Sequence, residues 1–162
     1  MPSFTFPFTS LSPWAPERPL LAVTIRNPAN GLDDQTWAII DTGADRCIFP
    51  EYIAKRLCHT LKHKDVQCDT ANTVGGDVLV YKHTFDLSVS SLKKTKTGVS
   101  IGSEIVIHKP RMLVDVVPAR FEDAKGEKIH TNFHSVLLGV DDFLADYLIT
   151  IDYPQHEFSF EW

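Results

Sequence analysis

The apolar stretches of this chain are short, and turn-forming residues interrupt them at close intervals. Runs of about four to eight β-branched, aromatic and aliphatic residues between such interruptions are typical of strands. The predicted strands are Leu20–Ile25, Thr36–Ile40, Val66–Thr70, Val78–Val89, Glu104–His108, Met112–Val117, Val136–Leu138, Tyr147–Tyr153 and Glu157–Trp162. One helix is predicted after Pro50, where Ile53, Leu57 and Leu61 recur at fourfold spacing, and a second at Asp141–Asp146. The sequence therefore predicts an all-β fold with one or two short helices.

The length of 162 residues suits one domain, which we assign to residues 20–162. Residues 1–19 are rich in proline and phenylalanine, and the prolines exclude a helix there. Phe4, Phe6 and Phe8 alternate with other residues, which is the period of an extended segment with one apolar face. We predict that this N-terminal arm lies along the domain as an arm or an edge strand.

Charge and cysteine usage narrow the classes of function. The chain has 16 basic and 21 acidic residues, a net charge of -5, so we do not expect nucleic-acid binding, which depends on phosphate neutralisation. Its one basic run, at residues 93–96, is interpreted as a solvated loop. The first residues lack the basic and apolar regions of a secretory signal, and no apolar run is long enough to span a membrane. Three cysteines without framework spacing favour a reducing compartment, so we expect a cytoplasmic protein.

The segment most indicative of chemistry runs from Ala38 to Asp45, where an apolar strand leads into Asp41-Thr42-Gly43. This pattern places a carboxylate where a buried strand gives way to a tight loop. By itself it is also compatible with an ordinary Asp turn at a strand end. A second motif follows downstream, in which the apolar residues 136–138 precede Gly139 and a short helix leads to the strand at residues 147–153.

In combination and order, the two motifs resemble those of retropepsins, the retroviral-type aspartic proteases. The resemblance implies a closed, barrel-like acid protease fold with one lobe per chain. It also implies an endopeptidase that works as a homodimer on extended peptide or protein substrates without cofactor or metal. Asp41 of each copy would form the catalytic pair, in which two close carboxylates share a proton and activate a water molecule. Thr42 would hydrogen-bond across the twofold axis, and Gly43 would leave room for the substrate backbone.

The resemblance further implies a flap, which falls on the hairpin from Val66 to Val89 with its tip at residues 72–76. Glycines at the tip would give the backbone the freedom to close over a peptide. Asp45 would hold the substrate or brace the loop, or else act as a structural ion-pair partner, for instance of Arg46. The residues expected to bind substrate are Ala44, Asp45, Ile48, Val74, Gly75, Gly76 and Leu138.

Three other interpretations remain open at this point. The chain could be a catalytically inactive retropepsin-like dimer that binds peptides. It could be a hydrolase with Cys47 as nucleophile. Zinc binding by Cys58, His59, His63 and Cys68 is disfavoured, because their spacing matches no common ligand pattern, and Cys58 is expected to face the core.

Two segments, residues 1–19 and residues 102–134, exceed what a minimal retropepsin needs. Residues 102–134 form a long insertion in which we predict an exposed polar loop between Pro118 and Asn132. At the C-terminus, Phe158, Phe160 and Trp162 alternate, which suits a strand that interleaves with a partner chain. We therefore expect that deletion of residues 157–162 leaves an inactive monomer.

Overall fold

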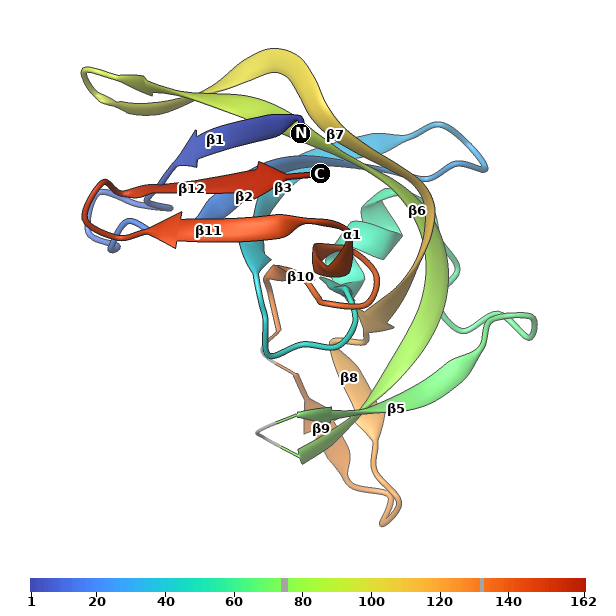
Figure 1. Ribbon diagram of the computed structural model, residues 1–162. Helices are drawn as coiled ribbons and strands as arrows, with labels where there is room; N and C mark the ends of the chain where they lie inside the picture. Colours follow the sequence, from blue (N-terminus) through green and yellow to red (C-terminus); the bar gives the residue numbers. More distant parts are fainter. Residues whose placement is uncertain (74–75, 132) are drawn as a thin grey trace.

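A computed structural model of the chain describes residues 1–73, 76–131 and 133–162 (Figure 1). Its strands are β1 Ser3–Pro7, β2 Leu20–Arg26, β3 Asp33–Ile40, β4 Ile48–Pro50, β5 Cys68–Thr73, β6 Gly76–Thr95, β7 Gly98–Val117, β8 Arg120–Glu122, β9 Lys128–His130, β10 Val136–Leu138, β11 Leu148–Asp152 and β12 Glu157–Glu161. Helical structure within these ranges is limited to α1, Glu51–Arg56, and a 3₁₀ turn, η1, at Leu144–Asp146. The all-β prediction is confirmed. None of the helices described is long and apolar enough to cross a membrane.

The main sheet has the strand order β2-β3-β10-β4-β7-β6-β5, and an additional pairing of β2 with β6 closes it into a ring. β10 is one of the strands of this ring and lies between β3, to which it is parallel, and β4, to which it is antiparallel. Apolar side chains from the ring strands fill its interior, and among the fully buried ones are Val23, Ala38, Phe49 and Phe85. Their burial supplies the main driving force for folding.

A second sheet, of order β1-β12-β11, packs against the ring (Figure 1). Phe6 of β1 stacks on Phe158 of β12 with ring centroids 5.2 Å apart, and Phe158 and Phe160 are both buried. The N-terminal arm thus includes an edge strand. The expectation that the C-terminal strand interleaves with a partner is wrong, because β1 and β11 of its own chain occupy both edges of β12. Deleting β12 would remove core aromatics and the centre of this sheet.

β6 and β7 form one long hairpin, where the sequence predicted separate shorter strands. Shifts of register beside Phe85, Val89 and Ser90 mark bulges, which bend a long ribbon so that it can follow a curved core. The basic run predicted as a loop begins within the end of β6, and its residues are exposed as expected. The hairpin turns at Gly98, whose φ of 142° favours glycine.

Helix α1 begins after Pro50, and a Glu51–Lys55 ion pair of 2.7 Å spans its single turn. Ile53 and Leu57 are buried as predicted. The prediction for Cys58 is wrong: the helix ends before it, and Cys58 is exposed in a left-handed conformation with φ of 59°. The apolar periodicity was followed to Leu61, whereas the helix ends at Arg56.

The polar segment after Pro118 is not a plain loop but contains the β8–β9 hairpin. Its turn is held by Asp123, whose Oδ1 accepts hydrogen bonds from the backbone N–H groups of Lys125 and Glu127, each at 2.8 Å. Its base is tied to α1 by a 2.6 Å hydrogen bond from Ala119 N–H to Glu51 Oε2. Local side-chain to backbone bonds of this kind stabilise turns in polar sequences that hydrophobic patterns do not detect.

Candidate active site

Asp41 lies at the point where β3 ends, and three hydrogen bonds define its position. Its N–H donates to Leu138 O on β10 at 3.1 Å, and its own carbonyl accepts from Ala44 N–H at 3.2 Å. Its carboxylate Oδ1 accepts from Gly43 N–H at 3.0 Å. The side chain is half-buried, so it is oriented by its loop and yet remains accessible. A carboxylate in this setting can exchange protons with a bound water or substrate.

The Gly139 segment clasps the loop that carries Asp41. Val140 N–H donates to Ala44 O at 2.8 Å, and Asp141 N–H donates to Asp45 O at 2.7 Å. A Cβ atom added to Gly139 would lie only 2.2 Å from the carbonyl oxygen of Arg46 and 2.8 Å from that of Ala44. Only glycine allows this close approach of two backbone segments. The structure thus brings together the two motifs that the sequence singled out.

The remaining residues of the loop are arranged at its open side. Thr42, Gly43 and Asp45 are exposed, and Ala44 is half-buried. Asp45 forms no ion pair within the part of the chain that the structure describes, so the pairing with Arg46 weighed above is not seen.

Of the apolar residues expected to line the substrate pocket, Ile48 on β4 is half-buried and pairs with Leu137 on β10. The expectation that Leu138 lines the substrate pocket is wrong, because its side chain is completely buried in the core. Neighbouring residues of a strand face opposite sides, so the half-buried side chain on this strand is that of Leu137. What Leu138 supplies to the site is its carbonyl oxygen, which accepts the bond from Asp41.

The hairpin expected to form the flap is present as β5 and β6, with Thr73 paired to Gly76 next to the tip. Gly76 has a φ of 108°, which favours glycine, and its carbonyl accepts a 2.6 Å hydrogen bond from Thr73 Oγ1. The other two expected tip residues, Val74 and Gly75, lie outside the described residues.

A charged cluster beside the loop was missed in the sequence. Arg46 follows the loop of Asp41, and its Nε lies 3.4 Å from Asp115 Oδ2 on β7. One of its terminal nitrogens lies 3.6 Å from Asp142 Oδ1 and donates to Leu113 O at 2.9 Å. Asp142 in turn accepts a hydrogen bond from Cys47 N–H at 2.9 Å. These contacts tie the loop to β7 and to the segment that follows Gly139.

The cluster continues onto the β5–β6 hairpin through Lys82 of β6. Lys82 Nζ lies 2.7 Å from Asp115 Oδ1 and 3.9 Å from Asp69 Oδ2 of β5. The side chains of Asp115 and Lys82 are 5% and 9% exposed, so each charge depends on its partner. The sequence feature that could have revealed this ion pair is Asp115, the one carboxylate in the otherwise apolar strand from Met112 to Val117. A buried charge in such a strand implies a cation on a neighbouring strand.

Cys47 is completely buried. The pKa of its thiol is raised to about 12, chiefly because burial penalises the charged thiolate. Its Sγ accepts a hydrogen bond of 3.4 Å from Gly139 N–H. Cysteine reacts as an accessible thiolate. Here burial prevents access to the sulfur, and the raised pKa disfavours the thiolate. The geometry therefore contradicts a Cys47 nucleophile. Within the described ranges, no three or more His, Cys, Asp or Glu side chains gather as a metal site.

A comparison with protein-family models gave no match to this chain, and a comparison with the sequences of curated proteins gave none either. The inference of function therefore depends on the residues and geometry described above.

Proposed function

We propose that this protein is an aspartic endopeptidase of the retropepsin type that hydrolyses extended peptides as a homodimer. The observation that carries the proposal is the loop of Asp41, which is anchored to β10 and clasped by the Gly139 segment while its carboxylate stays accessible. The accessible Thr42 and Gly43, the ring-shaped sheet and the β5–β6 hairpin agree with it. We also propose that the protein is located in the cytoplasm.

The mechanism needs two carboxylates, and the chain has a single Asp-Thr-Gly sequence. A twofold axis brings the same residue of two copies to one place. Two Asp41 carboxylates at hydrogen-bonding distance share one proton, because both cannot ionise there. The ionised carboxylate takes a proton from a bound water, which attacks the scissile carbonyl. The protonated carboxyl gives its proton to the carbonyl oxygen, and a proton then passes to the leaving amine.

We further propose that the two copies meet through β11. The outer edge of β11 pairs with no strand of the described chain, whereas β1 on the other side of the sheet lies against β6 (Figure 1). Exposed apolar side chains accompany β11: Leu148 is 59% exposed and Ile151 is 38% exposed. β11 also follows η1 closely, and Leu144 at the start of η1 donates to Gly139 O at 3.0 Å. Pairing of β11 with β11 of a second copy would thus bring the two catalytic loops near each other.

The substrate would lie extended between the loop and the β5–β6 hairpin. An extended peptide gains affinity from backbone hydrogen bonds and specificity from pockets for alternate side chains. Ile48 and Leu137 are half-buried and supply apolar surface on the loop side.

The experiment compares wild type, Asp41→Asn and Asp33→Asn on a peptide library across about pH 3 to 8, a range that covers coupled carboxylate titration. Asp33→Asn is the matched control, since it makes the same change at an exposed position at the opposite end of β3. Cleavage lost only in Asp41→Asn, with the oligomeric state unchanged, is the expected result. Equal cleavage by wild type and Asp41→Asn would refute the assignment. A folded wild-type dimer that cleaves nothing would favour a peptide-binding module.

A further inference from the structure

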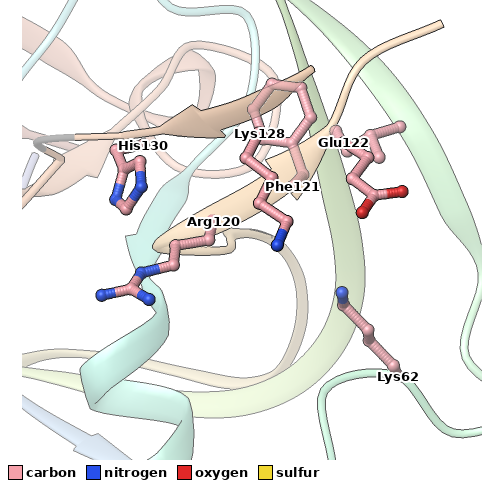
Figure 2. A pocket seen from close by; sticks show the side chains of 7 residues that line it. Lys62, Arg120, Phe121, Glu122, Lys128 and His130 are labelled. Atoms are coloured by element: carbon pink, nitrogen blue, oxygen red, sulfur yellow. The ribbon is translucent and has the colours of Figure 1, made fainter. Parts of the chain in front are cut away.

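A pocket of about 470 Å³ lies between the flap hairpin and the β8–β9 hairpin, away from Asp41 in sequence and in its lining (Figure 2). Lys62, Arg120 and Lys128 contribute three cationic side chains to its wall, and Glu122 contributes one carboxylate. Phe121 of β8, which is 8% exposed, and Leu79 of β6 supply its apolar surface. The pocket is thus locally basic on a chain whose net charge is -5.

The three cations of this pocket, Lys62, Arg120 and Lys128, form no ion pair within 4.0 Å with the described part of the chain. In Figure 2 the amino groups of Lys62 and Lys128 point toward each other from opposite sides of the pocket. The one carboxylate of the wall, Glu122, does not balance the three cations, and an anion placed between the two lysines would reduce their mutual repulsion.

The walls of the pocket are built by ordered elements. The turn at Asp123 and the bond from Ala119 to Glu51 fix the β8–β9 hairpin, and Thr131 Oγ1 closes its base with a 2.5 Å hydrogen bond to Pro118 O. On the opposite side, Lys62 Nζ lies 5.9 Å from the ring centroid of Tyr81 on β6. The insertion therefore presents its charges from a fixed position.

A second pocket of about 420 Å³ shares Lys62 and Arg120 with the first and extends toward α1. Its other cation, Lys55, is already paired with Glu51 at 2.7 Å. The two pockets adjoin at Lys62 and Arg120, so the basic surface continues from the insertion toward α1.

We propose that this surface, which we call the insertion pocket and define by Lys62, Arg120, Phe121 and Lys128, binds oxyanion side chains of a polypeptide, either carboxylate or phosphate. The inference rests on the proposed peptide-binding function. Leu79 belongs to the strand of the flap hairpin, so a polypeptide held by that hairpin has the insertion pocket beside it. The pocket gives the protein a preference for acidic segments outside the scissile bond, and this is the role of the β8–β9 insertion.

The test uses the Asp41→Asn protein, so that bound peptide is not cleaved, and three labelled peptides of one backbone that carry Glu-Glu, phosphoserine-Glu or Gln-Gln. Binding is measured by fluorescence anisotropy in Asp41→Asn alone, with Lys62→Glu/Lys128→Glu, and with Lys93→Glu/Lys96→Glu. The last pair is the control, because it makes the same change of net charge at exposed positions on the β6–β7 hairpin. Thermal unfolding of each variant verifies folding.

The acidic peptides are expected to bind more tightly than Gln-Gln. Lys62→Glu/Lys128→Glu should weaken their binding about tenfold, which corresponds to about 1.4 kcal/mol. The control should leave binding within about twofold, and added salt should weaken only the acidic peptides. The glutamate and phosphoserine peptides separate the two kinds of oxyanion. Equal binding of all three peptides, or equal loss in the control, would overturn the proposal.

Cleavage by the protein with Asp41 intact separates the two proposals. If Gln-Gln peptide is cleaved and the charge dependence is absent, only the insertion pocket fails. If nothing is cleaved while the acidic peptides still bind through Lys62 and Lys128, only the proposed catalysis fails.

Discussion

Replacement of Gly139 by alanine should displace the loop that carries Asp41 through a steric clash that can be located atom by atom. The new methyl group would lie 2.2 Å from the carbonyl oxygen and 2.3 Å from the carbonyl carbon of Arg46, and 2.8 Å from the carbonyl oxygen of Ala44. All three atoms belong to the backbone of the loop, so no side-chain rotation relieves the clash. Ordinary contact distances require this loop to retreat by about 1 Å, and a misplacement of that size can lower a rate by ~100-fold.

Gly102→Ala is the matched control. Its added methyl group would also meet an atom at 2.1 Å, but this atom is the Oγ of Ser91, which can rotate. We expect Gly139→Ala to lose about 1–3 kcal/mol of unfolding free energy, as overpacked sites do, and kcat/KM to fall ~100-fold. Gly102→Ala should keep kcat/KM within about threefold. Peptide cleavage and thermal unfolding provide the two readouts. Wild-type activity and stability in Gly139→Ala would refute the argument that this close approach positions Asp41.

Asp115→Asn removes the counter-charge of the nearly buried Lys82 and should lower the unfolding free energy measured in urea by about 3 kcal/mol. Lys82→Met combined with Asp115→Asn should recover part of this loss, and additive losses would contradict the coupling. Burial, followed by the neighbouring His83, lowers the pKa of His59 from 6.5 to about 4. Because the unfolded state binds the proton first, stability should be constant above about pH 6.5 and decline toward pH 4, and His59→Phe should flatten this decline. A thiol reagent should modify the exposed Cys58 and Cys68 in the native protein, and Cys47 only after unfolding; rapid native modification of Cys47 with loss of activity would restore the cysteine mechanism. Leu148→Lys/Ile151→Lys on β11 should give an inactive, folded monomer in sedimentation, whereas the control Ile101→Lys/Ile105→Lys, at exposed positions on β7, should stay dimeric. A β11 variant that remains dimeric would contradict the proposed interface.

The parts of the fold that the sequence predicted are those with strong local patterns. An apolar strand leading to Asp41 and the later apolar run before Gly139 were both identified, and the structure packs them together. The helix after Pro50 followed from a proline and the spacing of Ile53 and Leu57. In each case the local signal and the tertiary environment favour the same structure.

The parts that were missed depend on partners distant in the sequence. Alternation at Phe158 and Phe160 correctly indicated a strand with an apolar face, but the pattern does not say whether that face packs on its own chain or on another. Leu138 was assigned to a pocket by its motif, although strand geometry turns it into the core. The ion pair of Lys82 with Asp115 joins residues 33 positions apart, and the spacing of apolar residues along the sequence cannot reveal it. The β8–β9 hairpin arises from bonds made by Asp123, which no apolar periodicity marks.

The central claim is that one active site uses Asp41 from two copies of the chain, and a subunit-mixing experiment tests it most directly. Wild type and Asp41→Asn are refolded together in equal amounts, and cleavage is compared with that of wild type alone at the same total concentration. A shared site is active only in dimers with two intact Asp41 residues, so activity should fall to about one quarter. Asp33→Asn mixed in the same way should leave activity unchanged. A fall to only about one half would mean that each chain acts with its own Asp41, and it would contradict the account.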